Sequence, residues 1–126
     1  MSHIKSKGTK PEILVRKALF KQGFRYRINV SNLCGCPDIV LPKYNVVIFV
    51  NGCFWHGHEN CKKAKLPETN TDFWRDKIDK NRKRDAYITN SLERDGWKTV
   101  VVWECELKKS VFESTISKII KIILAD

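Results

Sequence analysis

The chain has 126 residues, 42% of them hydrophobic, which fits a single domain built around one core. Its 24 lysines and arginines outnumber its 14 acidic residues, and the net charge of +10 favours a polyanionic partner, with nucleic acid first and an anionic membrane surface second. Neither a run of about 18 apolar residues nor an apolar leader segment is present, so we expect a cytoplasmic protein whose five cysteines are thiols or metal ligands.

The first half of the chain predicts one helix followed by three strands. Residues 1–8 form a basic arm, and Thr9 with Glu12 makes a T-x-x-E capping box that predicts a helix over residues 10–22, ended by Gly23. Alternating apolar and basic residues predict a half-buried strand over 24–30. After a turn-rich stretch over 31–36, further strands are expected over 38–41 and 46–50. The second of these is an unbroken apolar run, which is typical of a central strand.

The second half predicts a long loop over residues 52–70, then a helix, a strand and a helix. The helix over 72–94 has Thr71 as its candidate N-cap and Gly96 as its stop. A strand follows over 98–103, and an amphipathic helix over 111–124. This order predicts an α/β fold in which a small mixed β-sheet is flanked by helices.

Cysteine and histidine side chains gather directly after the predicted central strand. A tetrahedral Cys₃His site is typical of structural zinc, because Zn²⁺ prefers such a closed set of soft ligands. The predicted zinc ligands are Cys53, His58, Cys61 and Cys105. The alternative is a set of buried cysteines beside surface histidines.

The remaining residues of this loop suggest contact with a substrate. His56 is left over by the zinc assignment, and a neutral imidazole can act as a general base near pH 7. Phe54 and Trp55 stand on a polar loop, and Trp74 begins the next helix. Exposed aromatic side chains on a basic protein can stack on bases or wedge into a base step. The alternative is a small satellite core beneath the loop.

Oxygen-bearing groups at the ends of two strands are candidates for a second metal site, and the alternative is that Pro37-Asp38 only forms a turn. Asp38 begins one strand, and Val50 and Asn51 end the next. A carboxylate and a polar group that converge at such a place are ligands that Mg²⁺ accepts together with phosphate oxygens. Glu12 is either only the capping-box carboxylate or an acid that reaches a metal-bound water from the first helix.

Several motifs together resemble one family. They begin with Asp38-Ile-Val-Leu-Pro-Lys-Tyr, Val-Ile-Phe-Val-Asn-Gly-Cys-Phe-Trp-His-Gly-His and Leu66-Pro67, and continue with Thr69-Asn-Thr-Asp-Phe-Trp74 and Val102-Trp-Glu-Cys105. In this order and spacing they are similar to the very-short-patch-repair mismatch endonucleases, from Met1 to about Leu107. The resemblance implies a restriction-endonuclease-like core related to the PD-(D/E)xK nucleases.

The resemblance also implies roles for single residues. Asp38 and the backbone carbonyl of Val50 match Mg²⁺ ligands, His56 matches the general base, and Glu12 matches the acid near metal-bound water. The zinc ligands match those predicted above. The residues that match DNA contacts are Met1, Phe54, Trp55 and Trp74.

The sequence departs from the family pattern at a few positions. Asn51 stands where well-known members carry a second active-site histidine, so it can donate a hydrogen bond to a phosphate but cannot shuttle a proton. The loop through Glu59-Asn60 is one residue longer than in some relatives. Cys34 and Cys36 replace a proline and a basic residue, as a local variation or a secondary thiol site. Met1 matches an internal position, so we expect a shortened N-terminal arm.

The function implied is Mg²⁺-dependent nicking of one DNA strand beside a T·G mismatch, which leaves a 5′-phosphate and starts very short patch repair. The chain is expected to act as a monomer at the bacterial nucleoid, with DNA repair proteins as possible partners and no membrane contact. Two alternatives remain: a restriction or nicking endonuclease that cuts matched DNA, and a DNA-binding relic without catalysis.

Overall fold

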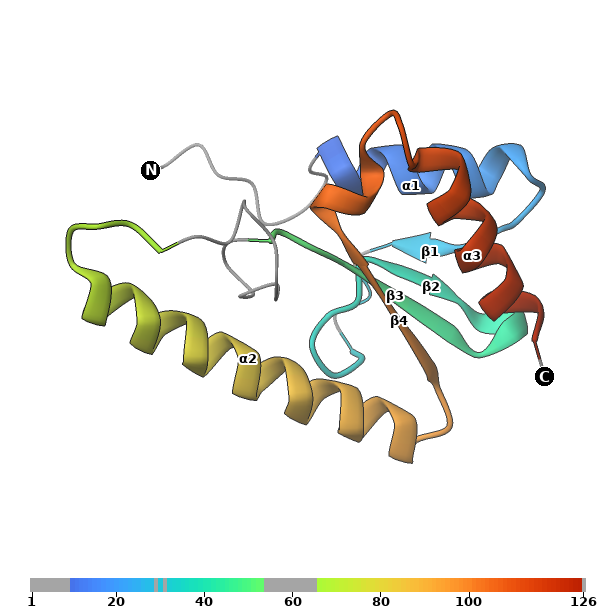
Figure 1. Ribbon diagram of the computed structural model, residues 1–126. Helices are drawn as coiled ribbons and strands as arrows, with labels where there is room; N and C mark the ends of the chain where they lie inside the picture. Colours follow the sequence, from blue (N-terminus) through green and yellow to red (C-terminus); the bar gives the residue numbers. More distant parts are fainter. Residues whose placement is uncertain (1–9, 29, 31, 54–65, 126) are drawn as a thin grey trace.

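The computed structural model describes residues 10–28, 30, 32–53 and 66–125, drawn in colour in Figure 1. The order of elements confirms the predicted alternation of helices and strands. They are α1 (Lys10–Lys21), β1 (Arg27–Ile28), β2 (Ile39–Leu41), β3 (Val46–Asn51), α2 (Thr71–Arg94), β4 (Lys98–Trp103) and α3 (Phe112–Leu124), with the short 3₁₀ helices η1 (Pro42–Tyr44) and η3 (Glu104–Leu107).

The strands form a mixed sheet in the order β1-β2-β3-β4. β1 pairs with β2 and β2 with β3 in antiparallel fashion, whereas β3 and β4 run parallel. Helices α1 and α3 cover one face of the sheet, and α2 crosses the other (Figure 1). This confirms the small mixed sheet with flanking helices, and it confirms that the apolar run over 46–50 is a central strand.

The main hydrophobic core lies between the sheet and helices α1 and α3. Alternate residues of β3 and β4 enter it, as expected when one face of a strand is buried against helices. Its strand and helix residues include Val46, Ile48, Val100, Val102, Val15, Leu19, Ile116, Ile119 and Ile123. A smaller cluster of Val40, Val47 and Leu92, with Ile88 packed against it, lies on the α2 face.

Helix α2 is long relative to the surface that it covers. The residues near its C-terminal end, Ile88 and Leu92, pack on the sheet, and the N-terminal end extends beyond the sheet (Figure 1). Phe73 and Tyr87 are exposed. No helix within the described residues combines the length and the apolar character needed to cross a membrane.

The strand predicted over 24–30 is wrong in extent, because β1 covers only Arg27–Ile28 among the described residues. Phe24 instead closes α1, since its N–H donates to the carbonyl of Leu19 at 3.1 Å after Gly23 turns the chain with a φ of +94°. The predicted alternation also fails at Ile28, whose side chain is 42% exposed at the sheet edge.

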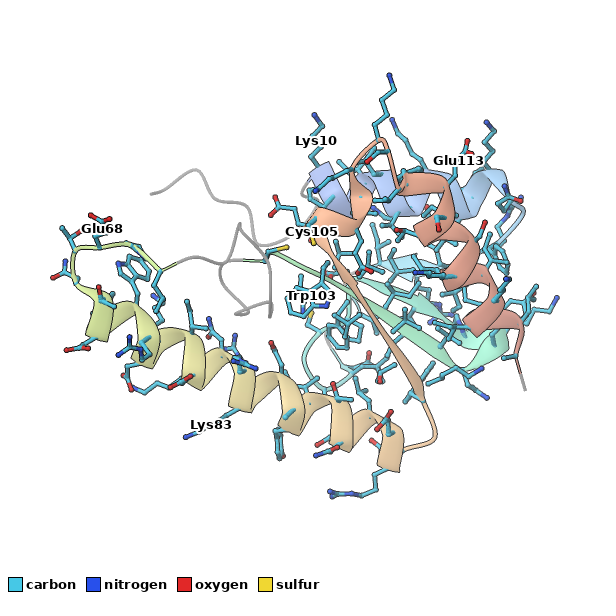
Figure 2. All side chains as sticks on the ribbon, viewed as in Figure 1. Lys10, Glu68, Lys83, Trp103, Cys105 and Glu113 are labelled. Atoms are coloured by element: carbon cyan, nitrogen blue, oxygen red, sulfur yellow. The ribbon has the colours of Figure 1, made fainter. Side chains whose placement is uncertain are left out.

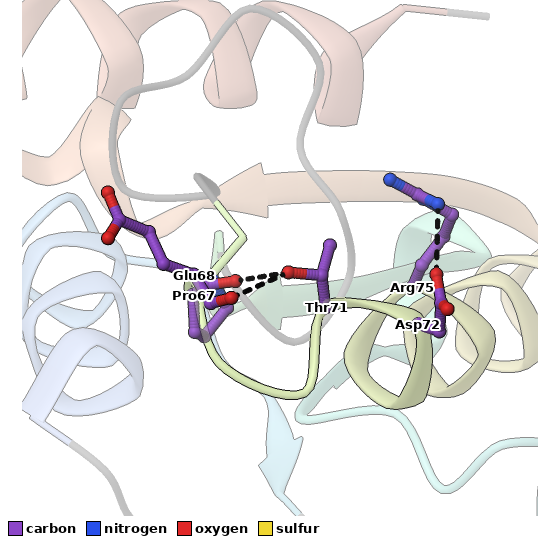
Figure 3. A network of polar contacts seen from close by, with 5 residues as sticks. All are labelled: Pro67, Glu68, Thr71, Asp72 and Arg75. Carbon is purple, nitrogen blue, oxygen red and sulfur yellow. Dashed lines mark hydrogen bonds and ion pairs between the residues drawn. The ribbon is translucent and has the colours of Figure 1, made fainter.

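The assignment of Thr71 as the N-cap of α2 is also wrong. Asn70 occupies that position with a φ of +54°, and Thr71 is the first helical residue. The Thr71 hydroxyl points back to the carbonyls of Pro67 and Glu68, at 2.9 and 3.1 Å, while Asp72 and Arg75 form an ion pair one turn into the helix (Figure 3). The threonine therefore fixes the turn that precedes α2. The predicted Thr9–Glu12 capping box involves Thr9, which lies outside the described residues.

Candidate active site

Asp38 and Val50 meet where β2 begins and β3 ends. The two strands are antiparallel, so the start of one lies beside the end of the other. The N–H of Val50 donates to Oδ2 of Asp38 at 2.7 Å. In an extended strand the N–H and C=O of one residue point to the same side. The Val50 carbonyl therefore lies on the Asp38 side of β3, as a backbone metal ligand requires.

Glu12 reaches the same place from helix α1. Its side chain is buried and shares a hydrogen bond with the Asp38 carboxyl group. Burial, opposed by the Val50 hydrogen bond and reinforced by the nearby charge of Glu12, raises the pKa of Asp38 to about 7. Two acids that face each other in this way hold a shared proton or attract a cation.

We call Glu12, Asp38 and the Val50 backbone the oxygen cluster. Its donors are two carboxylates and one carbonyl, which are the hard ligands that Mg²⁺ prefers. A divalent cation would also favour the ionised form of Asp38, offsetting the burial and, to a smaller extent, the charge of Glu12 that raise its pKa. The residues present therefore fit a Mg²⁺ ion.

Asn51 is buried at the end of β3, next to the oxygen cluster in sequence. Val46, Ile48 and Val50 pack toward α1 and α3, so alternation places the Asn51 side chain on the α2 face. Glu12 approaches from the α1 face. Polar side chains therefore lie at this end of the sheet on both faces, Glu12 on the α1 face and Asn51 on the α2 face.

Cys53 and Cys105 lie side by side just beyond β3 and β4. In the parallel register Asn51 pairs with Trp103, and two residues further the N–H of Cys105 donates to Sγ of Cys53 at 3.4 Å. Cys53 is completely buried, and Figure 2 shows Cys105 next to Trp103 at the end of β4.

Helix η3 holds Cys105 in this position. The Glu106 carboxylate accepts the N–H of Trp103 at 2.9 Å, and the Thr115 hydroxyl donates to the Glu106 carbonyl at 2.7 Å. The turn after β4 is thus tied both to the strand and to α3. Two of the four predicted zinc ligands are therefore adjacent, which fits a shared metal ion.

Comparison with known proteins matches the sequence to one family. A family model described as DNA mismatch endonuclease Vsr matches residues 1–63. The chain is 52% identical over 122 residues to the type II nicking enzyme V.NmeAIP of Neisseria meningitidis serogroup A, covering 96% of this chain and 86% of the relative. It is 46% identical to the type II nicking enzyme V.XorIIP of Xanthomonas oryzae (85% and 78% covered), and 41% identical to the DNA mismatch endonuclease Vsr of Escherichia coli (86% and 69%).

The chain belongs to the Vsr family. Membership makes it a DNA endonuclease, and the resemblance seen in the motifs is confirmed.

Several predicted site residues of this Vsr-family chain lie outside the described residues. These are Met1, Phe54, Trp55, His56, His58 and Cys61. Among the described residues, no group of three or more His, Cys, Asp or Glu side chains is arranged to hold a metal ion. The zinc tetrad therefore stays a prediction, with Cys53 and Cys105 as its described half.

Trp74 lies in the first turn of α2, away from the oxygen cluster. Its backbone N–H donates to the carbonyl of Asn70 at 3.1 Å, and its ring packs edge-on against Phe73 with centroids 5.2 Å apart. Trp74 is half-buried and Phe73 is exposed. The projecting end of α2 thus carries an aromatic pair beyond the sheet.

Arg16 is a site residue that the motifs of this Vsr-family chain did not single out. It lies one helical turn after Glu12, and its positive charge acts on Asp38, lowering the pKa of that group against the larger effects that raise it. Its i+4 spacing from Glu12 is the signal in the sequence that would have marked it, because residues so spaced share one face of a helix.

Proposed function

We propose that this chain nicks one strand of duplex DNA beside a T·G mismatch by Mg²⁺-dependent hydrolysis, leaving a 5′-phosphate and starting very short patch repair. The observation that carries the proposal is the oxygen cluster of Glu12, Asp38 and Val50 at the end of the sheet. The 41% identity to the Escherichia coli enzyme named a DNA mismatch endonuclease supports the mismatch as substrate.

Each residue of the proposed active site has a separate role. Asp38 and the Val50 carbonyl would hold Mg²⁺, which would supply polarisation of the scissile phosphate. His56 accepts a proton from the attacking water, and Glu12 orients water beside Asp38. Asn51 donates a hydrogen bond to a phosphate oxygen and takes no part in proton transfer.

Recognition rests on charge and aromatic side chains. The net charge of +10 binds duplex DNA through its phosphates, so affinity falls steeply with salt. Phe54, Trp55 and Trp74 wedge into the mismatched step, with Met1 assisting from the arm. A mismatch lowers the cost of unstacking, which is one physical source of selectivity.

The test is a nicking assay on a duplex library that carries one T·G pair within randomised flanking sequence, beside the same library with T·A. Sequencing of the nicked ends reports position and context together. We expect nicks in the T·G library alone, lost with EDTA and in Asp38→Asn. Binding without nicks in any context would make the chain a DNA-binding relic.

Cleavage of matched DNA is the second candidate. It is favoured by the relatives at 52% and 46% identity, both of which are named type II nicking enzymes. Equal nicking of the T·A and T·G libraries at one recurring sequence would establish this function instead. The restriction-endonuclease-like core proposed here serves both reactions.

Zinc is proposed as a structural ion held by Cys53, His58, Cys61 and Cys105. The burial of Cys53 and the N–H···S hydrogen bond from Cys105 support it, because amide donors stabilise thiolates. We expect one zinc per chain by elemental analysis, and loss of zinc and of thermal stability together in Cys105→Ser. The matched control is Cys34→Ser, which keeps the metal. A Cys105→Ser protein that retains full zinc would refute the ligand set.

A further inference from the structure

Arg16 occupies a position that its helix and its surroundings define closely. On α1 it shares a face with Glu12 and Leu19, both buried against the sheet, and it is itself only partly exposed. The Tyr26 hydroxyl donates to the Arg16 carbonyl at 3.0 Å and ties this turn of α1 to the chain entering β1. The Arg16 backbone is therefore held in place in the middle of α1, one helical turn after Glu12.

The charge balance of the site explains why a cation is needed there. Glu12 and Asp38 place two acids together, and the segment Val50-Asn51-Gly52-Cys53 at the end of β3 contains no basic residue. A phosphate diester brings one more negative charge, and its hydrolysis adds another in the transition state. One Mg²⁺ ion would balance the two carboxylates, and the charge that develops on the phosphate would then have no counter-charge from these segments.

The Arg16 side chain is suited to supply that charge. Its positive charge reaches Asp38, and no carboxylate lies within 4 Å of its guanidinium among the described residues. Arginine presents several N–H donors in a planar fork that matches two phosphate oxygens. Arg16 thus lies near the two acids and forms no ion pair with any carboxylate of the described residues.

We propose that Arg16 is a catalytic residue that donates hydrogen bonds to the non-bridging oxygens of the phosphate being cleaved. The proposal rests on the endonuclease function above. Arg16 on helix α1 would then supply the positive charge that residues 50–53 at the end of β3 lack.

The experiment measures single-turnover nicking of saturating T·G duplex by Arg16→Ala and Arg16→Lys. Lys17→Ala is the control, since it removes one positive charge from the next, exposed position of the same helix. We expect Arg16→Ala to be slower by about 10- to 100-fold, as for loss of charge-assisted hydrogen bonds in a transition state. We expect Arg16→Lys to recover only part of the rate and Lys17→Ala to nick at the wild-type rate.

Two further readouts separate this role from a structural one. Added guanidinium at millimolar concentration is expected to restore part of the nicking rate of Arg16→Ala and to leave the wild-type rate unchanged. It should not change the thermal midpoint of the Arg16→Ala protein. If Arg16 served only to keep Asp38 ionised, raising the pH to 9 would restore the rate instead, and the proposal would be overturned. A wild-type rate in Arg16→Ala would overturn it too. If the wild type itself nicks no duplex, the endonuclease proposal has failed and the Arg16 assignment falls with it.

Discussion

The Val50 N–H and the Asp38 carboxylate, joined at 2.7 Å, fasten the end of β3 to the start of β2. The donor is backbone, so the contact does not depend on the side chain at position 50. This explains how an apolar valine stands at a proposed Mg²⁺ position without weakening it. The same contact fixes the carboxylate that Glu12 approaches from α1.

The raised pKa of Asp38 means that its ionised form lowers the free energy of unfolding. An unfolded aspartate ionises near 3.8, whereas Asp38 ionises near 7, so between these values the native state binds more protons than the unfolded state. The free energy of unfolding therefore falls as the pH rises from about 4 to 7. We expect Asp38→Asn, which keeps an acceptor for Val50 and gains a donor for Glu12, to be more stable than wild type by on the order of 2 kcal/mol at pH 8.

Urea unfolding of both proteins at pH 5 and pH 8, without divalent metal, checks this expectation. The stability difference should be small at pH 5 and larger at pH 8. An Asp38→Asn protein that is less stable than wild type at pH 8 would contradict it.

Mg²⁺ should stabilise the protein more at high pH than at low pH. Protons and Mg²⁺ compete for the Asp38 carboxyl group, whose pKa without metal is about 7, so a lower pH disfavours Mg²⁺ binding. We expect 10 mM Mg²⁺ to raise the thermal midpoint at pH 8, to raise it less at pH 6, and to leave Asp38→Asn unchanged at both. An equal rise in wild type and variant would place the ion elsewhere.

Lys98 caps the last turn of α3. Its ammonium group donates to the carbonyls of Ile122 and Ala125, at 2.8 and 2.5 Å, at the end of α3, where the Ile122 carbonyl also accepts the backbone N–H of Ala125 at 3.3 Å. We expect Lys98→Met to lower the free energy of unfolding by about 1 kcal/mol in a urea titration. Lys118→Met, on an exposed position of the same helix, should change it little. Equal losses in both variants would argue against the cap.

Gly35 lies three residues before Asp38 and close to the side chain of Ile88 in helix α2. Its φ is +75°, and a Cβ there would lie 2.5 Å from Cγ2 of Ile88. Gly23 also has a positive φ, +94°, but nothing lies within 4 Å of a Cβ built there. We expect Gly23→Ala to cost about 1 kcal/mol from backbone strain alone, and Gly35→Ala to cost about 2–4 kcal/mol.

A double-mutant cycle isolates the steric part. Combining Gly35→Ala with Ile88→Ala should recover the excess cost, giving a coupling energy of about 1–2 kcal/mol. Strictly additive losses would show that Ile88 does not confine this glycine.

The sequence predicted the parts of the fold that depend on local pattern. The apolar run at Val46–Val50 marked the central strand, and Gly23 and Gly96 ended helices with positive φ values, as expected. Asp38 is a candidate by sequence because it begins a predicted strand. It lies beside Val50 because β2 and β3 are antiparallel, so the start of one strand is next to the end of the other.

What could not be predicted depends on tertiary contacts. The residues after Gly23 alternate like a strand, yet Phe24 returns to the carbonyl of Leu19 and the Tyr26 hydroxyl to that of Arg16. Thr71 is a good N-cap by type, but two carbonyls before it compete for its hydroxyl. Arg16 carries no motif of its own, and its importance follows only from the pairing of Glu12 with Asp38.

The pairing of β3 with β4 has a consequence for how the molecule forms. It joins residues 52 positions apart, and Cys53 meets Cys105 at the same separation. Glu12, Asp38 and Val50 are instead brought together by one helix and adjacent antiparallel strands. Short chain closures precede long ones, so we expect the oxygen cluster to assemble early in folding and the two thiols to meet late. A ribosome-bound chain that has emerged only as far as β3 would already hold all the residues of the cluster, while the partner of Cys53 was still unmade.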